Sequence, residues 1–434
     1  MTVQTSQTQR AEALEQFDVV VVGGGPSGAT AATDLARAGR SVLLIDRDGR
    51  IKPCGGAIPP ALIREFEIPD ALLVAHVTSA RMVSPSSQEV DMPIDNGYVG
   101  MVDREVFDEW LRERARACGA RRVTGTFEKL ERDVDGAAIV VWREKCGAVH
   151  GGADAGGDGR SGTLRRVRAR AVIGADGAQS VVARTALPDV APAPYVYAYH
   201  EIVASPAGEE RARAPKFDPA RCDVYYQGRL SPDFYGWVFP HGATTSVGTG
   251  TAQRGFSLRH ATSALRESAG LAGARTIRRE GAPIPMRPMK RWDNGRDVLL
   301  AGDAAGVVAP ASGEGIYYAM VGGRFAGEAV QAYLATGRSV ELASARKRFM
   351  RAHGKVFWVL GIMQKFWYSS DRRRERFVSI CRDKDVQKLT WESYMNKKLT
   401  RKKPMAHVRI FFKDLAHLLG LVKARPDAVD GAGR

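Results

Sequence analysis

The fold is decided by residues 17–28, which read FDVVVVGGGPSG. The four successive valines predict a short strand that is buried on both faces. A G-x-G-x-x-G pattern follows and leads into an Ala-rich segment that reads as a helix ending at Gly39. The glycines of this pattern are Gly23, Gly25 and Gly28, and Ser27 lies between the last two. A strand, turn and helix of this kind can hold a pyrophosphate at the N-terminus of the helix.

A second buried strand, Ser41–Ile45, ends at an acidic residue. Asp46 follows Gly28 by 18 residues and is placed to accept hydrogen bonds from ribose hydroxyls. We assign the next residue, Arg47, to the adenosine side of the same dinucleotide. The pattern therefore predicts dinucleotide binding, with a tight turn in an ordinary α/β unit as the alternative.

Composition restricts the class of protein. The chain has 434 residues, 44% of them apolar, which excludes a disordered, collagen-like or disulfide-rich small protein. The formal charge of +16 favours anionic partners, although an Arg-rich proteome would give the same excess. Five scattered cysteines without a C-x-x-C pair indicate a reducing compartment and no zinc or other metal site. No secretory signal or membrane-spanning run is visible, so we expect a cytoplasmic protein.

A second glycine-and-acid turn distinguishes between dinucleotides. Residues 301–306 read AGDAAG after a buried strand at 297–300, and SGEGI at 312–316 precedes a long helix. Asp303 can bind ribityl hydroxyls, and the helix can point its positive end at the flavin edge that becomes anionic on reduction. The residues expected at that helix start are Gly313, Gly315 and Ile316. Two such turns favour FAD over NAD.

A third motif, GADGAQS at 174–180 with Arg184 beyond it, lies between these two. In this order the three motifs resemble the flavoprotein superfamily of aromatic hydroxylases and prenyl reductases. The resemblance implies an α/β fold: a Rossmann-like, three-layer FAD-binding domain, an interleaved antiparallel β-sheet substrate domain and a helical C-terminal region. It implies that Asp46 binds the adenosine ribose, Asp303 the ribityl–phosphate region, and Asp176 and Arg104 other parts of the cofactor. For Arg104, which would lie over the flavin phosphate, a solvent-facing place in the first helical turn is the alternative.

The expected domain boundaries follow from these motifs. A polar leader covers 1–16, the FAD-binding domain covers 17–190 and 290–340, the substrate domain covers 191–289, and a basic helical region covers 341–434. Residues 147–162 read as an inserted surface loop.

Two further motifs, KPCGG at 52–56 and YGWVFP at 235–240, resemble the geranylgeranyl reductase family, and the segment 383–421 resembles its chlorophyll and bacteriochlorophyll branch. This resemblance implies an oxidoreductase of bacteriochlorophyll biosynthesis that uses FAD and NADPH. Its substrate would be geranylgeranylated bacteriochlorophyll(ide) or free geranylgeranyl diphosphate, and three double bonds would be reduced to give phytyl. It also suggests association with the bacteriochlorophyll synthase step. The alternatives are an FAD monooxygenase on a lipophilic aromatic substrate, a reductase of archaeal-type lipids, a pigment carrier and, weakly supported by charge alone, a nucleic-acid-binding protein.

The chemistry of an electron-rich alkene favours protonation to a tertiary cation followed by hydride delivery. Tyr235, Trp237 and Phe239 alternate along a strand, share one face and can stabilise positive charge with their rings. We expect them, with Pro240, to bind the prenyl chain, and Tyr235 and Trp237 to act in catalysis; ordinary sheet-core packing is the alternative. Cys54, beside Gly55, would lie near the flavin and relay a proton, unless it is only a small buried hydrophobe.

The C-terminal region is basic. Residues 371–403 contain twelve Lys and Arg against five Asp and Glu, and aromatic residues flank them on both sides. This pattern indicates peripheral contact with an anionic inner membrane, while a helical cap with a solvated charged face is the alternative.

Overall fold

The protein is described by a computed structural model that covers residues 14–47, 51–95, 97–145 and 162–397. Most of the expected leader and of the inserted loop, and the part of the basic tail beyond Lys397, lie outside the described residues.

A six-stranded sheet carries the first motif. Its strands are β1 (Gln16–Val22), β2 (Val42–Asp46), β8 (Arg121–Arg132), β9 (Ala138–Glu144), β10 (Thr163–Gly174) and β16 (Val298–Leu300). The parallel part runs β8-β2-β1-β10-β16, and β9 pairs antiparallel with both β8 and β10. Val22 pairs with Ile45 and Gly174, and Gly174 pairs with Leu300. The carboxyl ends of four strands therefore meet at one edge, which is where an open α/β sheet binds its ligand.

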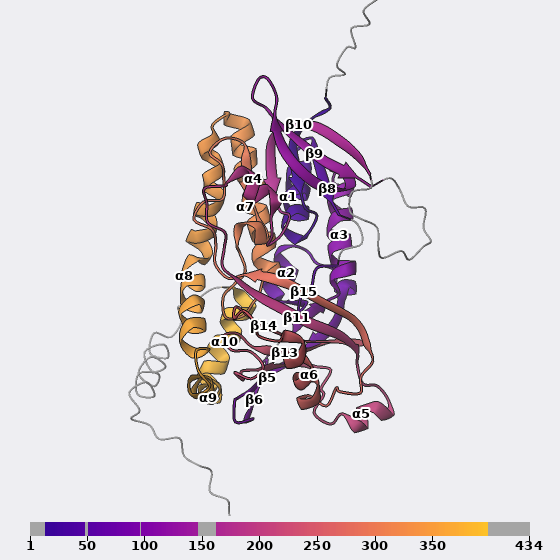
Figure 1. The fold of residues 1–434 in the computed structure, drawn as a ribbon, viewed down its shortest axis with the longest axis vertical. Coiled ribbons are helices and arrows are strands. Elements are labelled where there is room, and N and C mark those ends of the chain that lie inside the picture. The colour runs from indigo at the N-terminus through magenta and orange to yellow at the C-terminus, as the bar shows by residue number, and fades with distance from the viewer. Residues whose placement is uncertain (1–13, 48–50, 96, 146–161, 398–434) are drawn as a thin grey trace, which may run out of the picture.

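Two helices approach each other closely beside this edge. α1 (Pro26–Arg37) packs against α3 (Arg104–Ala117) and α7 (Ile316–Thr336) (Figure 1). A Cβ at Gly323 of α7 would lie 2.2 Å from the carbonyl oxygen of Ser27 in α1. Only glycine permits this distance, so the start of α1 rests directly on the backbone of α7.

A seven-stranded sheet forms the other half of the molecule (Figure 1). Its order is β15-β11-β14-β13-β12-β5-β6, antiparallel except between β5 and β12. The strands are β5 (Ser79–Val83), β6 (Glu89–Pro93), β11 (Tyr195–Ala204), β12 (Arg221–Tyr225), β13 (Gly236–His241), β14 (Thr244–Thr251) and β15 (Thr276–Pro285). Because β5 and β6 come from the first hundred residues, the chain enters this sheet well before residue 191, the boundary expected from the sequence.

Short elements connect the two halves. A three-stranded sheet has the order β3-β7-β4, with β3 (Ala57–Ile58), β4 (Leu73–Val77) and β7 (Val99–Val102). The short helices are α2 (Pro60–Glu65), α4 (Val181–Ala186), α5 (Glu209–Arg213) and α6 (Leu258–Ser268). Three 3-10 turns cover Asp70–Leu72, Gly302–Ala305 and Ser339–Ala343.

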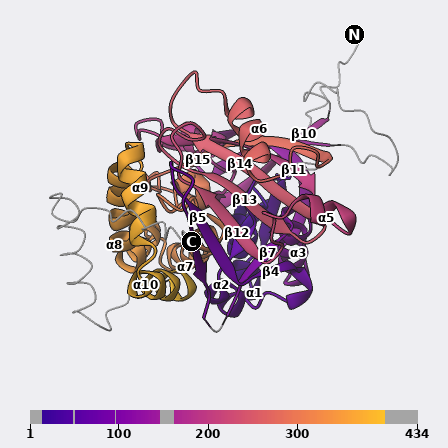
Figure 2. The ribbon, with the colours of Figure 1, turned by 90° about the horizontal axis from the view of Figure 1, so that it is seen from below.

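Three helices complete the C-terminal part: α8 (Ser344–Trp367), α9 (Asp371–Ile380) and α10 (Lys384–Asn396). α8 runs along the side of the molecule, and α9 and α10 lie beside the second sheet (Figures 1 and 2). This arrangement confirms the predicted α/β class with two sheets and a helical C-terminal region. Among the described helices, none is both long and apolar enough to cross a bilayer.

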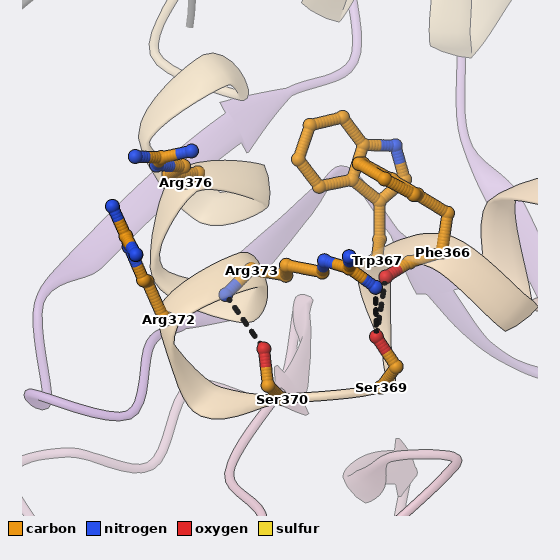
Figure 3. Close-up of a pocket in the computed structure, with 7 residues that line it drawn as sticks. All are labelled: Phe366, Trp367, Ser369, Ser370, Arg372, Arg373 and Arg376. Carbon is orange, nitrogen blue, oxygen red and sulfur yellow. Dashed lines mark hydrogen bonds between the residues drawn. The ribbon is translucent and has the colours of Figure 1, made fainter. Parts of the chain in front are cut away.

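A surface pocket of about 550 Å³ lies where α8 meets α9 (Figure 3). It is lined by Phe366, Trp367, Ser369, Ser370, Arg372, Arg373 and Arg376. The Arg373 guanidinium donates to Ser369 Oγ at 2.7 Å and lies 4.4 Å from the centre of the Phe366 ring. Within the described residues, Arg372 and Arg376 have no carboxylate partner, so this pocket carries uncompensated positive charge.

Candidate functional site: a nucleotide cradle joined to an apolar cavity

The first glycine turn has room for a ligand at one position. Gly23 has a φ of +104°, and a Cβ there would lie 2.3 Å from the Ala175 carbonyl oxygen; a Cβ at Gly28 would lie 1.9 Å from the Gly23 carbonyl oxygen. These two glycines are required by the protein's own backbone. Among the described residues, a Cβ at Gly25 would meet nothing within 4 Å, and no side chain caps the N-terminus of α1. Gly25 therefore borders open space in front of free backbone N–H groups, as pyrophosphate binding requires.

The second turn lies against the first. A Cβ at Gly302, whose φ is +64°, would be 2.7 Å from the Ser27 Cβ. Ser27 Oγ is buried between the two turns and has no hydrogen-bond partner among the described residues. A buried hydroxyl without a partner is rare in proteins and marks a place for an absent group. Two uncapped helix starts, at α1 and α7, and this hydroxyl fit a pyrophosphate-containing cofactor such as FAD.

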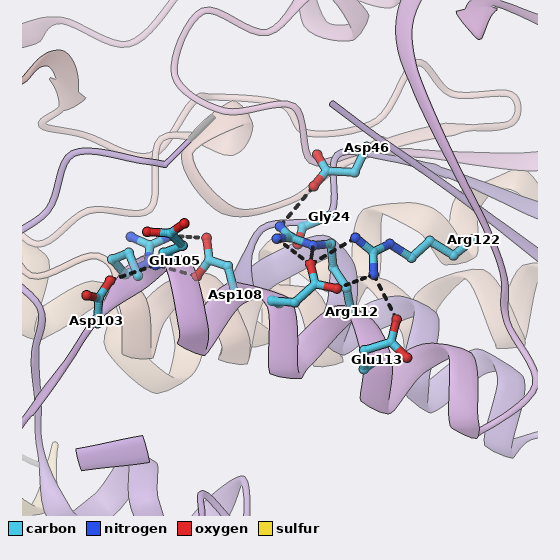
Figure 4. Close-up of polar contacts among 10 residues, drawn as sticks. Gly24, Asp46, Asp103, Glu105, Asp108, Arg112, Glu113 and Arg122 are labelled. Atoms are coloured by element: carbon cyan, nitrogen blue, oxygen red, sulfur yellow. Dashed lines mark hydrogen bonds and ion pairs between the residues drawn. The ribbon is translucent and has the colours of Figure 1, made fainter. Parts of the chain in front are cut away.

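Asp46 stands at the end of β2, as predicted, and is held by a residue that sequence reasoning missed. Its Oδ2 accepts a hydrogen bond from Arg112 Nη1 of α3 at 3.0 Å (Figure 4). Arg112 is in turn fixed by Glu109, which also binds Arg122. Asp46 Oδ1 accepts no hydrogen bond within the described part of the chain, so it stays available for a ribose hydroxyl. The neighbouring Arg47 is exposed.

Asp303 is buried in the second turn. Its Oδ2 is paired with Lys52 Nζ, and a Cβ on Gly315 would lie 4.0 Å from its Oδ1. Gly313, Gly315 and Ile316 lie where α7 begins. The Asp303 carboxylate and the start of α7 therefore converge on one spot, as predicted for the flavin half of the cofactor.

Arg104 is not solvent-facing. It is the first residue of α3, it is buried, and it forms two hydrogen bonds with Asp108, from Nε to Oδ1 at 2.8 Å and from Nη2 to Oδ2 at 2.6 Å. It lines the cavity described below together with Cys54. The Asp108 carboxylate compensates the charge of this guanidinium and holds it at the junction of the cofactor site and the cavity.

The Asp176 side chain holds a loop in place. Its carboxylate accepts hydrogen bonds from Ser180 Oγ at 2.5 Å and from the backbone N–H groups of Val181 and Val182 at 2.7 and 3.2 Å. These contacts cap α4, so the side chain holds the loop whose Ala175 carbonyl lies against Gly23. The structure supports a positioning role for Asp176 in the cofactor site.

A large apolar cavity opens beside the two turns. Its volume is about 740 Å³, within the roughly 300–1,000 Å³ that small-molecule sites span. It reaches Pro26 of the first turn, Asp303 of the second and the loop 52–57. The cradle and the cavity are therefore parts of one site.

The predicted aromatic residues lie together on the wall of this cavity. The Tyr235 and Trp237 rings are 6.1 Å apart, and those of Trp237 and Phe239 are 6.4 Å apart. Tyr235 donates its O–H to the Ser312 carbonyl oxygen at 2.6 Å, and Trp237 donates Nε1–H to Ser246 Oγ at 3.0 Å. The Tyr235 ring is thus fixed against the turn that precedes α7, and the Trp237 ring against β14.

Pro240 is not part of this wall. It is buried but does not line the cavity, because successive residues of β13 point to opposite faces of the sheet. The expectation that Pro240 binds substrate beside Phe239 is therefore wrong for its side chain.

Cys54 lies where the cradle meets the cavity. Its Sγ accepts a weak hydrogen bond from the Gly56 N–H at 3.4 Å, and the side chain is only partly buried. A Cβ at Gly55 would lie 3.0 Å from the Phe239 ring, so glycine lets this loop rest on the aromatic wall. The position suits a group that acts at the cofactor ring.

Comparison with known proteins agrees with this geometry. Residues 18–151 match the family of FAD dependent oxidoreductases. The chain is 57% identical, over 94% of its length and 98% of the relative's, to a geranylgeranyl diphosphate reductase from Rhodobacter capsulatus. A geranylgeranyl diphosphate reductase from Synechocystis is 36% identical over 92% of this chain and 97% of its own.

The chain belongs to the geranylgeranyl diphosphate reductase family. A solved structure of a geranylgeranyl bacteriochlorophyll reductase-like protein from Thermoplasma acidophilum has the same fold, with a TM-score of 0.74 and 20% identity over 94% of this chain and 99% of that one. The family confirms the predictions of an oxidoreductase and of FAD as its cofactor.

The C-terminal helices of the chain supply much of the cavity wall. The sequence did not predict this contribution. The lining residues from these helices include Val356, Val359, Leu360, Met363, Trp367, Phe377, Trp391 and Tyr394. Their spacing along α8 was visible, but it does not reveal whether a helix face packs on a core or lines a hollow. The same region supplies Lys397, whose ammonium is paired with Glu314. Glu314 was also missed, although it lies between the predicted Gly313 and Gly315.

Proposed function

We propose that this chain is an FAD-dependent, NADPH-driven reductase that converts the geranylgeranyl group of bacteriochlorophyll(ide), or of free geranylgeranyl diphosphate, to phytyl by reducing three double bonds. The observation that supports this most directly is the apolar cavity joined to both nucleotide turns. A flexible hydrocarbon chain can enter such a space only if its walls are apolar and water is excluded. The names of the family members point to the same substrate class.

When bound, reduced FAD would supply hydride to the alkene. The chain's own residues must bind the cofactor, exclude water and stabilise developing positive charge. The Trp237 and Tyr235 rings can provide up to about 2 kcal/mol of cation–π stabilisation in a desolvated site. Burial raises the pKa of Tyr235 above its ordinary value, and its hydroxyl is already committed to Ser312. Tyr235 therefore acts through its ring and not as an acid.

The test is an anaerobic incubation of the flavin-loaded protein with NADPH and geranylgeranylated bacteriochlorophyll, followed by mass spectrometry. Successive products that each gain the mass of two hydrogen atoms are expected. Oxygen consumption and oxygen insertion under air would instead indicate a monooxygenase. Flavin that NADPH reduces without any product would indicate a pigment carrier. Free geranylgeranyl diphosphate in a parallel reaction identifies the preferred acceptor.

A second part of the proposal concerns the membrane. Trp358 and Ile362, one helical turn apart on α8, are 69% and 47% exposed. They lie on the same helix as Phe366, which lines the basic surface pocket together with Arg372 and Arg376. An apolar helix face next to uncompensated arginines fits a bilayer that contains anionic lipids. We expect this face of α8 to contact the membrane peripherally, close to the part of the cavity wall that the same helix forms. A membrane-bound bacteriochlorophyll synthase could transfer its product to the cavity at this place.

Vesicle flotation tests this contact. The wild-type chain should float with vesicles that contain phosphatidylglycerol, and Trp358→Ser/Ile362→Ser should weaken flotation at unchanged melting temperature. Val134→Ser, on an exposed apolar residue of the turn between β8 and β9, is the matched control. Equal flotation of all three proteins would refute this face as the contact.

A further inference from the structure

Glu314 occupies an unusual place on the wall of the cavity. It lies in the turn just before α7, between Gly313, which packs on Phe234 and Tyr235, and Gly315, which lies close to Asp303. Its side chain is only 8% exposed. It therefore stands between the predicted flavin edge and the space predicted for the prenyl chain.

One oxygen of Glu314 is paired and the other is not. Oε2 is bonded to Nζ of Lys397, the residue that follows α10, which is 3% exposed. Oε1 is buried and has no hydrogen-bond partner within the described residues. A buried ion pair is a poor source of stability, and a carboxylate oxygen without a partner makes it poorer. The arrangement therefore calls for a functional explanation.

Several other polar groups that line the cavity are engaged. The nitrogen atoms of His200 contact Ser246 Oγ at 2.8 Å and Glu280 Oε2 at 2.9 Å. Asp303 is paired with Lys52, and the Tyr235 hydroxyl donates to a carbonyl. Among the described carboxyl groups of the cavity wall, Glu314 alone has a buried oxygen without a hydrogen-bond partner.

We propose that Glu314 is the acid that protonates the alkene and that Lys397 replaces the proton that Glu314 gives up. This assignment rests on the proposed reductase function. The O–H bond of Glu314 breaks as a C–H bond forms at one alkene carbon, and the cationic neighbour accepts the hydride supplied by reduced flavin. Lys397 then passes a proton from Nζ to Glu314 Oε2 and regains one from water. One proton and one hydride are consumed for each double bond, so atoms and charge balance. Glu314 is the catalytic residue, and Lys397 is a positioning residue that acts through it.

The surroundings favour this proton transfer within the pair. Burial raises the pKa of Glu314 and lowers the pKa of Lys397, although each partner's charge opposes the shift. Both shifts favour movement of the proton from nitrogen to oxygen. The other titratable groups that face the pair are Tyr317 and Tyr318 of α7, His353 of α8, Tyr394 of α10 and Tyr235 beside β13. The Lys397 ammonium lies 3.8 Å from the centre of the Tyr394 ring, so an aromatic face balances its charge when it is protonated.

The decisive experiment separates the two half-reactions in flavin-loaded protein. Glu314→Gln should leave the rate of anaerobic flavin reduction by NADPH unchanged, and should slow alkene reduction by pre-reduced protein at least about 100-fold, as expected for loss of a general acid. Lys397→Met should move the pH at which alkene reduction is half-maximal upward, because its charge no longer lowers the Glu314 pKa. Glu65→Gln, on an exposed carboxylate 3.4 Å from the Tyr317 hydroxyl, is the control and should match wild type.

A second readout needs neither substrate nor turnover. In Lys397→Met the buried Glu314 has no cationic partner, so the folded protein is more stable when this carboxyl is protonated. The melting temperature of Lys397→Met should therefore fall as the pH rises from about 6 to about 9, relative to that of the double variant Glu314→Gln/Lys397→Met. Glu314→Gln leaves an unpaired lysine whose pKa is lowered by burial, so its melting temperature should rise over the same range. If Glu314→Gln does not fold, the double variant, which buries no charge, replaces it in the kinetic test.

The outcomes are distinguishable. Wild-type alkene reduction by Glu314→Gln would overturn the proton-donor assignment and leave the proposed function intact. Parallel pH slopes in the two single variants would overturn the coupled pair whether or not product forms. A wild-type protein whose flavin is reduced but which reduces no alkene would instead refute the proposed function.

Discussion

The contrast between Gly25 and Gly28 gives the sharpest test of the nucleotide cradle. A Cβ at Gly28 would lie 1.9 Å from the Gly23 carbonyl oxygen, so Gly28→Ala must displace backbone. Overpacking of this kind costs about 1–3 kcal/mol, which lowers the melting temperature of a flavin-free protein of this length by roughly 1–3 °C. Gly25→Ala meets no atom within 4 Å in the part of the chain that the structure describes, and its φ of −71° and ψ of −178° are ordinary for alanine.

The two substitutions should therefore act on different states. Gly25→Ala loses a little at the helix N-cap and gains a little from a less flexible unfolded chain, so its net effect on the flavin-free protein stays within about 0.5 kcal/mol. Its methyl group enters the space in front of α1, and the clash should weaken FAD binding by about 1–3 kcal/mol, or roughly 5- to 150-fold.

Thermal unfolding of the flavin-free protein and fluorescence titration with FAD measure both effects. Gly273→Ala is the matched control, because a Cβ there also meets nothing within 4 Å, its φ is not positive and it lies outside the cradle. FAD binding by Gly25→Ala at the strength of the control would show that the pyrophosphate does not lie in front of α1. A loss of stability in the flavin-free Gly25→Ala protein as large as that of Gly28→Ala would refute the steric reasoning itself.

Three further predictions concern the cavity and its surroundings. Trp237→Ala should slow turnover by up to about 30-fold, the equivalent of 2 kcal/mol of cation–π stabilisation, at unchanged flavin content, while Trp237→Phe keeps most of the rate; normal turnover of the alanine variant would make Trp237 a packing residue. Cys54→Ser should lower turnover without loss of flavin, and a full rate would leave the thiol structural. Burial, with a contribution from Lys397, lowers the pKa of His353 to about 4. Between about pH 4 and about pH 6.5 the unfolded chain therefore binds more protons than the folded protein, and the free energy of unfolding decreases as the pH falls through this window. His353→Phe should lose less unfolding free energy than wild type across this window, by at most about 3 kcal/mol. Equal losses in the two proteins would contradict the lowered pKa.

The sequence was most informative where chemistry follows from local pattern. The turns at 23–28 and 301–316 were predicted because a tight turn, an adjacent buried strand and a spaced acid are all properties of neighbouring residues. The register of β1, β2, β10 and β16 then brings them to one edge. The aromatic face at 235–239 was predicted for the same reason, since the side-chain direction in a strand alternates with a period of two.

What the sequence did not reveal depends on contacts between distant residues. Arg112 holds Asp46 across 66 residues, and Lys397 pairs with Glu314 across 83. Neither partner belongs to a motif, and only tertiary packing brings them together. Pro240 was misplaced because the motif that contains it was treated as a unit, although adjacent residues of one strand face opposite sides. β5 and β6 join the second sheet for a similar long-range reason: β5 pairs with β12, about 140 residues later, which no local signal reports.

The contact between Gly323 and Ser27 has a consequence for how this protein can diverge. Main chain meets main chain there, so no side chain of α7 separates the start of α1 from the helix that follows the second turn. Substitutions elsewhere in the cavity wall, most of which comes from other segments, can reshape what the site accepts while the redox centre keeps its position. Substrate range and cofactor geometry are thereby decoupled, and new specificities can be selected without rebuilding the machinery that handles electrons.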